Sequence, residues 1–367
     1  MSFPITSFYA NQNTPKDEYQ EALELVSKNG LALKDLKEEF RKDPKIILAA
    51  VIQNGLSLEF ALYQDDEIVY AAIETNPLAL RFAPEYQENL CVVLYAISKN
   101  ADAILFAGPK LKANSVFINQ AAKYNIFILG YADEELTGDW DFMQGQIMQN
   151  PLAFQYATDE LQNDPDLALI AYRGNPTMLT CAGRKAVLKI VRLDGMALEH
   201  VRANFQDDYS VVYTAAQQNA QSIQFARKRA VIEMVRQNGL ILQLVNAQLR
   251  NDVEIVTAAF NETRESFQYA GRNAILTLVK HNGLLLLYAH PEFKNDEAIV
   301  RAAVAKDGEA IRYAHPRFRI DEEISLLAMR NTRTASRFVS GILTGDNLFM
   351  RRLNEGPNDL TNGFIGA

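Results

Sequence analysis

A short apolar run that follows Asn-Gly recurs along the chain and sets its periodicity. In its clearest copy it reads Asn54-Gly55-Leu56-Ser57-Leu58-Glu59-Phe60-Ala61. We refer to the last residue of each run as the closing residue. The chain holds 14 such copies, which close at Leu36, Ala61, Ala83, Ala107, Ala132, Ala157, Ala182, Val201, Ala226, Val245, Ala270, Ala289, Ala314 and Val339. Self-similarity at a nearly fixed period is typical of stacked repeat architectures.

The residue seven places before the closing residue is Asn, Asp or Thr in every copy. Each of these side chains has an oxygen that accepts a hydrogen bond from a free N–H at a helix start. Three copies continue with a proline (Pro77, Pro151 and Pro176), a residue that suits the first helical position. The slot therefore predicts the N-cap of a short helix and the end of a longer helix before it. The structural N-caps predicted in this way include Asn54, Asn76, Asn150, Asn175, Asn238 and Asn282.

Two further slots indicate packing. Three places before the closing residue the side chain is large and apolar in every copy except the last, which has Ser336. One place before the closing residue ten copies have Phe or Tyr. An aromatic stripe at a fixed slot of stacked helices is more typical of a core than of a cofactor site, so we expect both slots to be buried.

Longer helices are predicted between the short ones. Residues 44–51 carry apolar side chains at helical spacing and follow Asp43-Pro44, a cap with proline at the first position. Acidic pairs stand at other helix starts, and they are interpreted either as catalytic carboxylates or, preferably, as caps that the helix dipole favours. These pairs are Asp65-Asp66, Asp207-Asp208, Asp296-Glu297 and Glu322-Glu323.

The spacing of the closing residues predicts the organisation of the chain. It stays between 22 and 25 up to Ala182, and then alternates between 19 and 25 as far as Ala289, which makes a 44-residue double unit. We predict an all-α fold, a right-handed-type α-solenoid of helix–turn–short-helix repeats with about 14 half-units. The expected segments are a leader (1–13), a helical block (14–181), double repeats (182–340) and a flexible tail (341–367). Within the first block, segment 108–145 is interpreted either as a degenerate repeat or as a functional insertion.

Charge divides the chain at the same place. The net charge is −8, but residues 1–181 hold 13 Lys/Arg against 25 Asp/Glu, whereas residues 182–340 hold 22 against 17. This asymmetry indicates a charged partner surface or a head-to-tail contact. The acidic total argues against general nucleic-acid binding. No stretch approaches the roughly 20 apolar residues of a membrane span, and the N-terminus does not read as a classical secretion signal.

The sequence holds no recognisable catalytic, cofactor or metal motif. Its four histidines form no metal-binding pair, and His290-Pro291 and His315-Pro316 recur with the repeat, which favours a structural role. The two cysteines, Cys91 and Cys181, lack metal-type spacing and are expected to be small buried residues. We therefore predict no catalytic, cofactor-binding or metal-binding residue. A catalytic site assembled from distant residues is the remaining alternative.

Six basic residues share two slots of successive double units. Three are 44 residues apart (Arg184, Lys228 and Arg272), and three more follow eight residues later (Arg192, Arg236 and Lys280). Equivalent residues of a solenoid line up on one face, so the six predict a basic ladder for an anionic partner. A solvated helix face and bonds to helix C-terminal carbonyls are the simpler alternatives.

Two stretches carry a family resemblance. NGLSLEFA (54–61) with DDEIVYAAIETN (65–76), and NGLILQLVNAQLRNDVEIVTAAF (238–260), resemble the tandem repeat called domain of unknown function 4116, over roughly residues 21–340. Members of that family are common in intracellular bacteria that infect amoebae, and some are candidate injected effectors. The resemblance implies no catalytic residue. It implies a protein of the bacterial cytoplasm or, after injection, of the host cytosol, which acts as an effector or as a regulator of one.

The function predicted from the sequence is a non-enzymatic scaffold that binds a protein partner, because stacked repeats offer long binding surfaces. The alternative is an anionic ligand, a phospholipid headgroup or nucleic acid, bound by the basic ladder.

Overall fold

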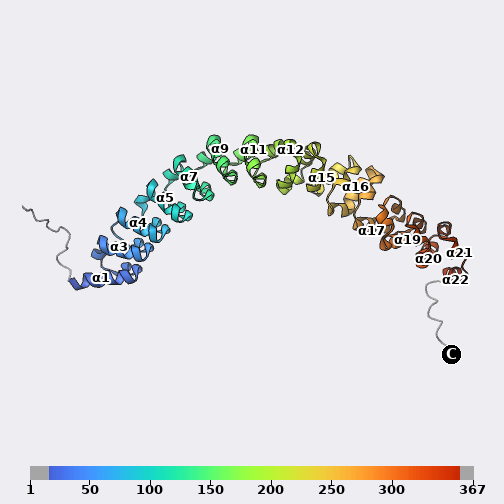
Figure 1. Cartoon of the computed structure of the whole chain (residues 1–367), viewed down its shortest axis with the longest axis horizontal. Helices are drawn as coiled ribbons and strands as arrows, with labels where there is room; N and C mark the ends of the chain where they lie inside the picture. Colours follow the sequence, from blue (N-terminus) through green and yellow to red (C-terminus); the bar gives the residue numbers. More distant parts are fainter. Residues whose placement is uncertain (1–15, 356–367) are drawn as a thin grey trace, which may run out of the picture. The chain divides into compact units, whose positions relative to one another are not determined.

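Long α-helices alternate with short 3-10 helices throughout the part of the chain that the structure describes. The structure is a computed structural model, and it describes residues 16–355, in which no strand occurs (Figure 1). The predicted all-α repeat fold is confirmed. The leader 1–13 lies outside the described residues.

The chain divides into two compact units, Met1–Cys181 and Ala182–Ala367. The long helices of unit 1 are α1 (Lys16–Lys28), α3 (Pro44–Gln53), α4 (Asp66–Thr75), α5 (Leu90–Lys99), α7 (Ser115–Ala122), α9 (Trp140–Gln149) and α11 (Pro165–Gly174). Those of unit 2 are α12 (Arg184–Leu193), α14 (Tyr209–Gln218), α15 (Lys228–Val235), α16 (Val253–Glu262), α17 (Arg272–His281), α19 (Glu297–Lys306), α20 (Glu322–Asn331) and α22 (Asn347–Asn354).

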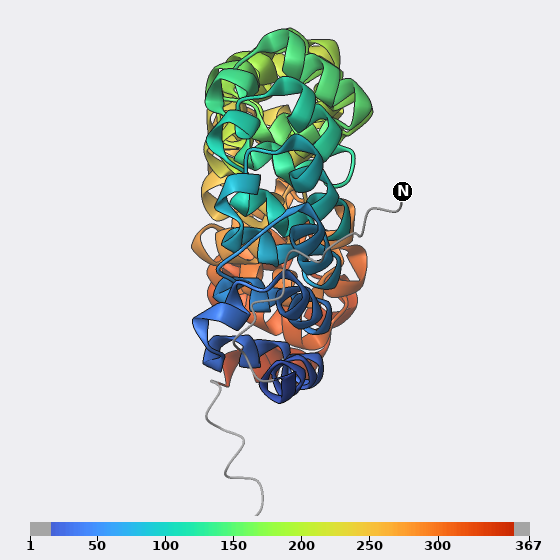
Figure 2. The same ribbon diagram turned by 90° about the vertical axis from the view of Figure 1, so that its left-hand side faces the viewer.

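One 3-10 helix ends one or two residues before each closing residue. In unit 1 these are η1 (Gly30–Asp35), η2 (Gly55–Phe60), η3 (Pro77–Phe82), η5 (Ala101–Phe106), η6 (Ile126–Tyr131), η7 (Pro151–Tyr156) and η8 (Pro176–Thr180). In unit 2 they are η9 (Gly195–His200), η10 (Ala220–Phe225), η11 (Gly239–Leu244), η13 (Arg264–Tyr269), η14 (Gly283–Tyr288), η15 (Gly308–Tyr313) and η17 (Arg333–Arg337). Consecutive long helices pack on one another, as α3 does on α4, and so do consecutive short ones, as η2 does on η3. Figure 2 shows unit 1 from its N-terminal end, with the helices arranged in two columns.

A third short helix explains the two spacings of the closing residues. Nearly all connections with the longer spacing contain one: α2 (Glu38–Arg41), η4 (Pro84–Tyr86), α6 (Pro109–Lys112), α8 (Glu134–Thr137), α10 (Asp159–Gln162), α13 (Ala203–Gln206), η12 (Leu249–Asn251), α18 (Pro291–Lys294) and η16 (Pro316–Arg319). The connections with the spacing of 19 run directly into the next long helix, as from η10 to α15. The double unit of unit 2 is therefore an alternation of these two connections.

One residue both ends each long helix and begins the short one. Asn54 has extended backbone angles (φ −154°, ψ 109°), and its N–H bonds to the Ala50 carbonyl at 2.9 Å, which closes α3. Its side-chain oxygen accepts the N–H of Leu56 at 3.1 Å, which caps η2. Asn76, Asn150, Asn175, Asn238 and Asn282 cap their short helices in the same way. Asn29, Thr263 and Thr332 occupy the slot with extended backbone but make no side-chain cap bond.

The core combines apolar residues of the long helices, such as Ile46 and Ile47, with the slot three residues before the closing residue. Leu58, Leu80 and Phe154 in this slot are at most 1% exposed. The expectation for the aromatic slot was wrong, because most of its rings are only half-buried and Tyr131 is 42% exposed. A 3-10 helix has three residues per turn and is narrow. Adjacent residues such as Ser57 and Leu58 fill its buried face, so Phe60, at its end, lies at the core margin.

Three other expectations are corrected by the structure. Segment 108–145 is regular, since α6, α7, η6, α8 and α9 follow the order of neighbouring repeats, and its glycines Gly108 and Gly138 flank short third helices. The predicted start of the flexible tail at residue 341 was wrong, because α21 (Gly341–Thr344) and α22 follow, and Phe349 of α22 is buried. The sequence did not reveal these helices because no Asn-Gly run directly follows α22. Residues 356–367 lie outside the described residues. Cys91 is exposed and Cys181 only half-buried, because both lie outside the slots that face the core.

Glycine at the start of a short helix permits close packing on the next long helix. A Cβ built on Gly283 would lie 2.2 Å from the Ala303 carbonyl oxygen, and one on Gly239 would lie 2.3 Å from that of Ala259. These carbonyls are the ones that accept the N–H of the next junction residue, Asp307 or Thr263. The short helices therefore pack directly against the closing hydrogen bonds of the long helices.

We predict that Gly283→Ala lowers the free energy of unfolding by about 1–3 kcal/mol, because backbone must move to admit the methyl group. Thermal and urea unfolding would measure the loss. The matched control is Gly145→Ala in the middle of α9, where an added Cβ has no atom within 4 Å. That control should be neutral or stabilising by up to ~1 kcal/mol. Equal effects at both positions would contradict the packing argument.

Candidate binding surface

The first triplet of the basic ladder joins successive helix starts. Arg184, Lys228 and Arg272 are the first residues of α12, α15 and α17. Each forms an ion pair with the Asp that caps the next long helix: Arg184 with Asp208 at 3.2 Å, Lys228 with Asp252 at 2.8 Å and Arg272 with Asp296 at 2.7 Å. We call these three residues the helix-start cations. Their charges are matched within unit 2, which favours a structural role.

The capping carboxylates are held in their ionised form. The hydrogen bond from Arg272 lowers the pKa of Asp296, helped by the N–H groups of Ala298 and Ile299 and opposed by partial burial. At Asp208 and Asp252 burial raises the pKa, but the bonds from the cation and from the helix N–H groups together outweigh it, so both pKa values are lowered.

Trp140, in segment 108–145, occupies the slot that is equivalent to that of the helix-start cations. Trp140 lies 44 residues before Arg184 and begins α9, and its indole N–H donates to the Asp164 carboxylate at 3.4 Å. Asp164 in turn caps α11. In four repeats, therefore, the first residue of one long helix bonds to the Asp that caps the next long helix, through a cation or through an indole N–H.

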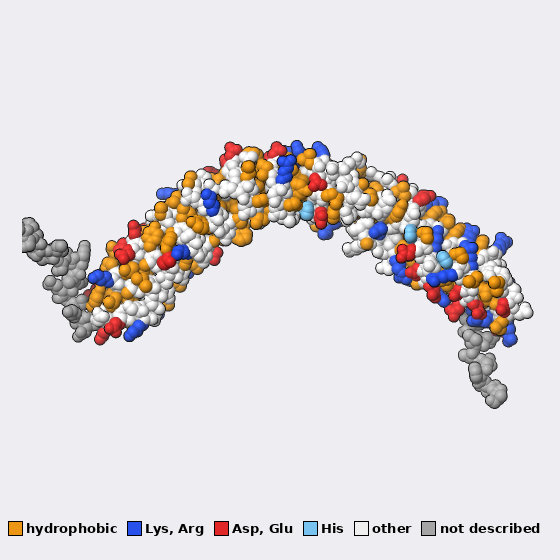
Figure 3. Space-filling view, viewed as in Figure 1, with side chains coloured by type: hydrophobic (Ala, Val, Ile, Leu, Met, Phe, Trp, Pro, Cys, Tyr) orange, Lys and Arg blue, Asp and Glu red, His pale blue; other side chains and the backbone are white. Residues whose placement is uncertain are grey.

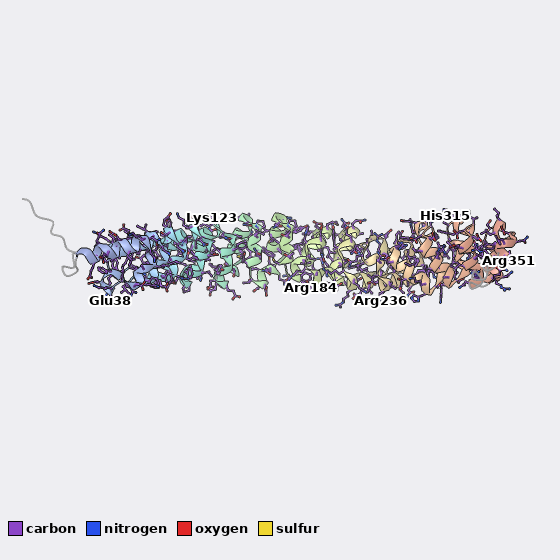
Figure 4. The ribbon with its side chains drawn as sticks, turned by 90° about the horizontal axis from the view of Figure 1, so that it is seen from below. Glu38, Lys123, Arg184, Arg236, His315 and Arg351 are labelled. Atoms are coloured by element: carbon purple, nitrogen blue, oxygen red, sulfur yellow. The ribbon has the colours of Figure 1, made fainter. Side chains whose placement is uncertain are left out.

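The second triplet is placed differently. Arg192 and Lys280 are the next-to-last residues of α12 and α17, and Arg236 directly follows α15. We call these three residues the helix-end cations. All three are exposed, and among the described residues their side chains have no hydrogen-bond or ion-pair partner. Figure 4 labels Arg184 and Arg236, one member of each triplet, and Figure 3 shows Lys and Arg on the visible face of unit 2.

Two of the helix-end cations lie beside open surface hollows. The hollow at Arg192 has a volume of about 350 Å³ and is also lined by Tyr213, Thr214, Gln217 and Gln218 of α14. The hollow at Arg236 has a volume of about 670 Å³ and is also lined by Val253, Glu254, Thr257, Ala258, Asn261 and Glu262 of α16. Tyr213 corresponds to Thr257, and Gln217 to Asn261, at the same 44-residue spacing. The two hollows are therefore equivalent places in successive double units.

The sequence comparison missed the amides of this surface. Gln217 and Asn261 stand nine residues before their closing residues, as Arg192, Arg236 and Lys280 do. They were overlooked because the ladder was compared only at the full double-unit spacing. Aligning every repeat on its closing residue would have revealed them, since the slot nine residues before the closing residue is exposed in every repeat of unit 2 from α12 to α20.

The other candidate residues have local structural roles. The Nδ1 atoms of His290 and His315 each accept a backbone N–H at 3.3 Å, at the starts of α18 and η16. Asp65, Asp208 and Asp296 of the acidic pairs are N-caps of α4, α14 and α19. Within residues 16–355 no group of three His, Cys, Asp or Glu side chains is placed to hold a metal ion.

These features define an all-α repeat protein whose unit is one long helix followed by one 3-10 helix. The family model described as Domain of unknown function (DUF4116) matches eight times, over residues 22–64, 65–112, 117–158, 147–185, 184–229, 230–273, 271–319 and 298–344. The chain belongs to this family. No curated protein and no solved structure matches the chain. Between residues 16 and 355, no helix has the length and apolar character needed to cross a membrane.

We predict that Arg272→Gln lowers the melting temperature at neutral pH, because Asp296 loses its cation. The lowered pKa of Asp296 means that this contribution is present above the ordinary carboxyl pKa and is lost as the pH falls through the folded-state value. Melting curves of the wild type and the variant should therefore converge in acid. A difference that stays constant from pH 7 to strongly acidic pH would contradict the ion-pair role.

Proposed function

We propose that this chain is a non-enzymatic scaffold that binds a protein partner through the helix-end cations and hollows of unit 2. The observation that carries the proposal is the pair of equivalent hollows, each beside an exposed cation with no partner of its own. An unmatched charge at a recurring position is available to an outside group, whereas the helix-start cations are already neutralised by Asp208, Asp252 and Asp296.

The family resemblance supports the biological setting of this proposal. An effector, or a regulator of one, in the bacterial cytoplasm or in the cytosol of a host cell would act by engaging another protein. A rigid stack of repeats suits that task because each unit adds surface without needing a new core.

The second candidate is an anionic small ligand or polymer, either a phospholipid headgroup or nucleic acid. It is favoured by the excess of basic over acidic residues in 182–340. Binding of this kind would weaken steeply with salt, because it rests on neutralised phosphates.

We predict that a variant with Arg192, Arg236 and Lys280 all changed to Glu loses the protein partner that the wild-type chain captures from host-cell and bacterial lysates. Reversing three exposed charges should replace attraction by repulsion while leaving the core intact. Quantitative mass spectrometry of the captured proteins would measure the loss. The control is Arg229→Glu on α15, which also reverses an exposed cation, one that pairs with Glu233 at 3.7 Å.

Failure to capture any protein with the wild-type chain would contradict the scaffold proposal. Capture of nucleic acid, or sedimentation with vesicles that contain anionic lipid, lost in the triple variant and in high salt, would favour the second candidate. A partner that the triple Glu variant captures as well as the wild-type chain does would exclude the helix-end surface as its binding site.

A further inference from the structure

One row of exposed side chains follows the C-terminal ends of the long helices of unit 2. It occupies the slot nine residues before each closing residue and contains Arg192, Gln217, Arg236, Asn261, Lys280, Ala305 and Arg330. Cations and small or amide side chains alternate along this row. All seven residues are exposed. The guanidinium of Arg330 donates to the carbonyl oxygens of Arg352 and Glu355, so it differs from the three helix-end cations.

The spacing of this row sets the size of its occupant. Packed helices lie about 8–10 Å apart, so cations on every second helix are roughly 16–20 Å apart. An extended polypeptide advances about 3.3 Å per residue, so it covers that distance in about 5–6 residues. Carboxylates separated by about six residues would therefore reach successive cations.

The side chains between the cations suit a polypeptide backbone. An Asn or Gln side chain has both a donor and an acceptor, so it can bond the N–H and C=O of one extended residue. Gln217 and Asn261 lie in the two hollows, between helices that present cations. Tyr213, 44% exposed and stacked on Tyr209 with ring centroids 5.6 Å apart, offers an apolar face in the first hollow.

The same spacing disfavours nucleic acid. A single strand carries a phosphate about every 3.4 Å in duplex geometry, so most phosphates along this row would find no cation. The Arg236 hollow also contains Glu254 and Glu262. Glu254 forms an ion pair with Lys228 at 3.0 Å. Glu262 would repel a ligand that carries closely spaced negative charges, as a nucleic acid does.

We propose that this row binds an extended acidic segment of a partner protein, with carboxylates about six residues apart on Arg192, Arg236 and Lys280 and its backbone on Gln217 and Asn261. The inference rests on the proposed scaffold function and specifies how its partner is recognised.

The test uses the whole chain and two labelled synthetic peptides, with binding followed by fluorescence anisotropy. One peptide carries three Glu residues about six residues apart in a Ser/Thr background, and the other has the same composition with the three Glu residues adjacent. The spaced peptide should bind several-fold more tightly.

Arg236→Gln should weaken the affinity for the spaced peptide by about three- to fivefold, as expected for one exposed ion pair. Asn261→Ala should also weaken it, and Glu262→Gln should tighten it.

The matched control is Arg229→Gln, which removes an exposed charge from α15, the helix that Arg236 directly follows, outside the row, and should leave the affinity unchanged. Melting curves of each variant establish that the stack is intact. Equal affinity for the two peptides, or an equal loss with Arg229→Gln, would overturn the proposal. So would tighter binding of single-stranded nucleic acid that depends on the same residues.

The two proposals fail separately. If neither peptide binds but the lysate partner is still lost in the triple Glu variant, recognition of an extended acidic segment is wrong and the scaffold function stands. If no peptide and no partner binds, both are wrong.

Discussion

The structure depends on the hydrogen bonds of one residue at each helix junction: its backbone N–H ends the long helix in every copy, and its side chain caps the short helix in all copies except those of Asn29, Thr263 and Thr332. In Asn54 the backbone N–H ends α3 and the side-chain oxygen begins η2. A 3-10 helix of six residues has poor hydrogen-bond geometry and is too short to persist alone, so its existence relies on this cap and on packing. The junction residue has similar extended backbone angles in every copy, for example φ −154° and ψ 109° at Asn54 and φ −140° and ψ 109° at Thr332. The slot three residues before the closing residue then faces the core in every copy except the last, which has Ser336, and the slot nine residues before it faces solvent in every copy of unit 2 from α12 to α20.

Helix polarity gives the two ends of each long helix different chemistry. The N-terminal end carries partial positive charge, which an Asp cap stabilises on α14, α16 and α19. The cation at the start of the preceding long helix pairs with that Asp, as Arg272 does with Asp296. The C-terminal end carries partial negative charge and favours a cation there. That preference favours Arg192 and Arg236 through space, without a hydrogen bond from either side chain among the described residues. Helix-end cations can therefore stabilise the fold and still be available to a partner.

Much of this arrangement could be predicted from residue types and their spacing. Asn, Asp and Thr at one slot identify the junctions because few other side chains can cap a helix, and Leu or Phe three residues before the closing residue identifies the core. The burial of the aromatic slot was mispredicted. The residue type shows that Phe60 is apolar, but it does not show that Phe60 lies at the end of a narrow 3-10 helix. The Arg272–Asp296 pairing was also missed, because its partners are 24 residues apart and meet only after two helices have packed. The amides Gln217 and Asn261 were within reach of the sequence, since they share the slot of the cations.

Differences in connection length, and not only in residue type, place the candidate binding surface. Both hollows lie between long helices that are joined through a third short helix, α12 to α14 through α13, and α15 to α16 through η12. The intervening steps, α14 to α15 and α16 to α17, lack that helix. The alternation of long and short connections thus gives the hollows the same 44-residue period as the cations beside them. At the next equivalent step, α17 to α19, the residues equivalent to Thr257 and Glu262 are Arg301 and Lys306. Arg301 is paired with Glu297 and Glu323, so it is matched within unit 2 as the helix-start cations are, whereas Lys306 brings a cation where the second hollow has Glu262.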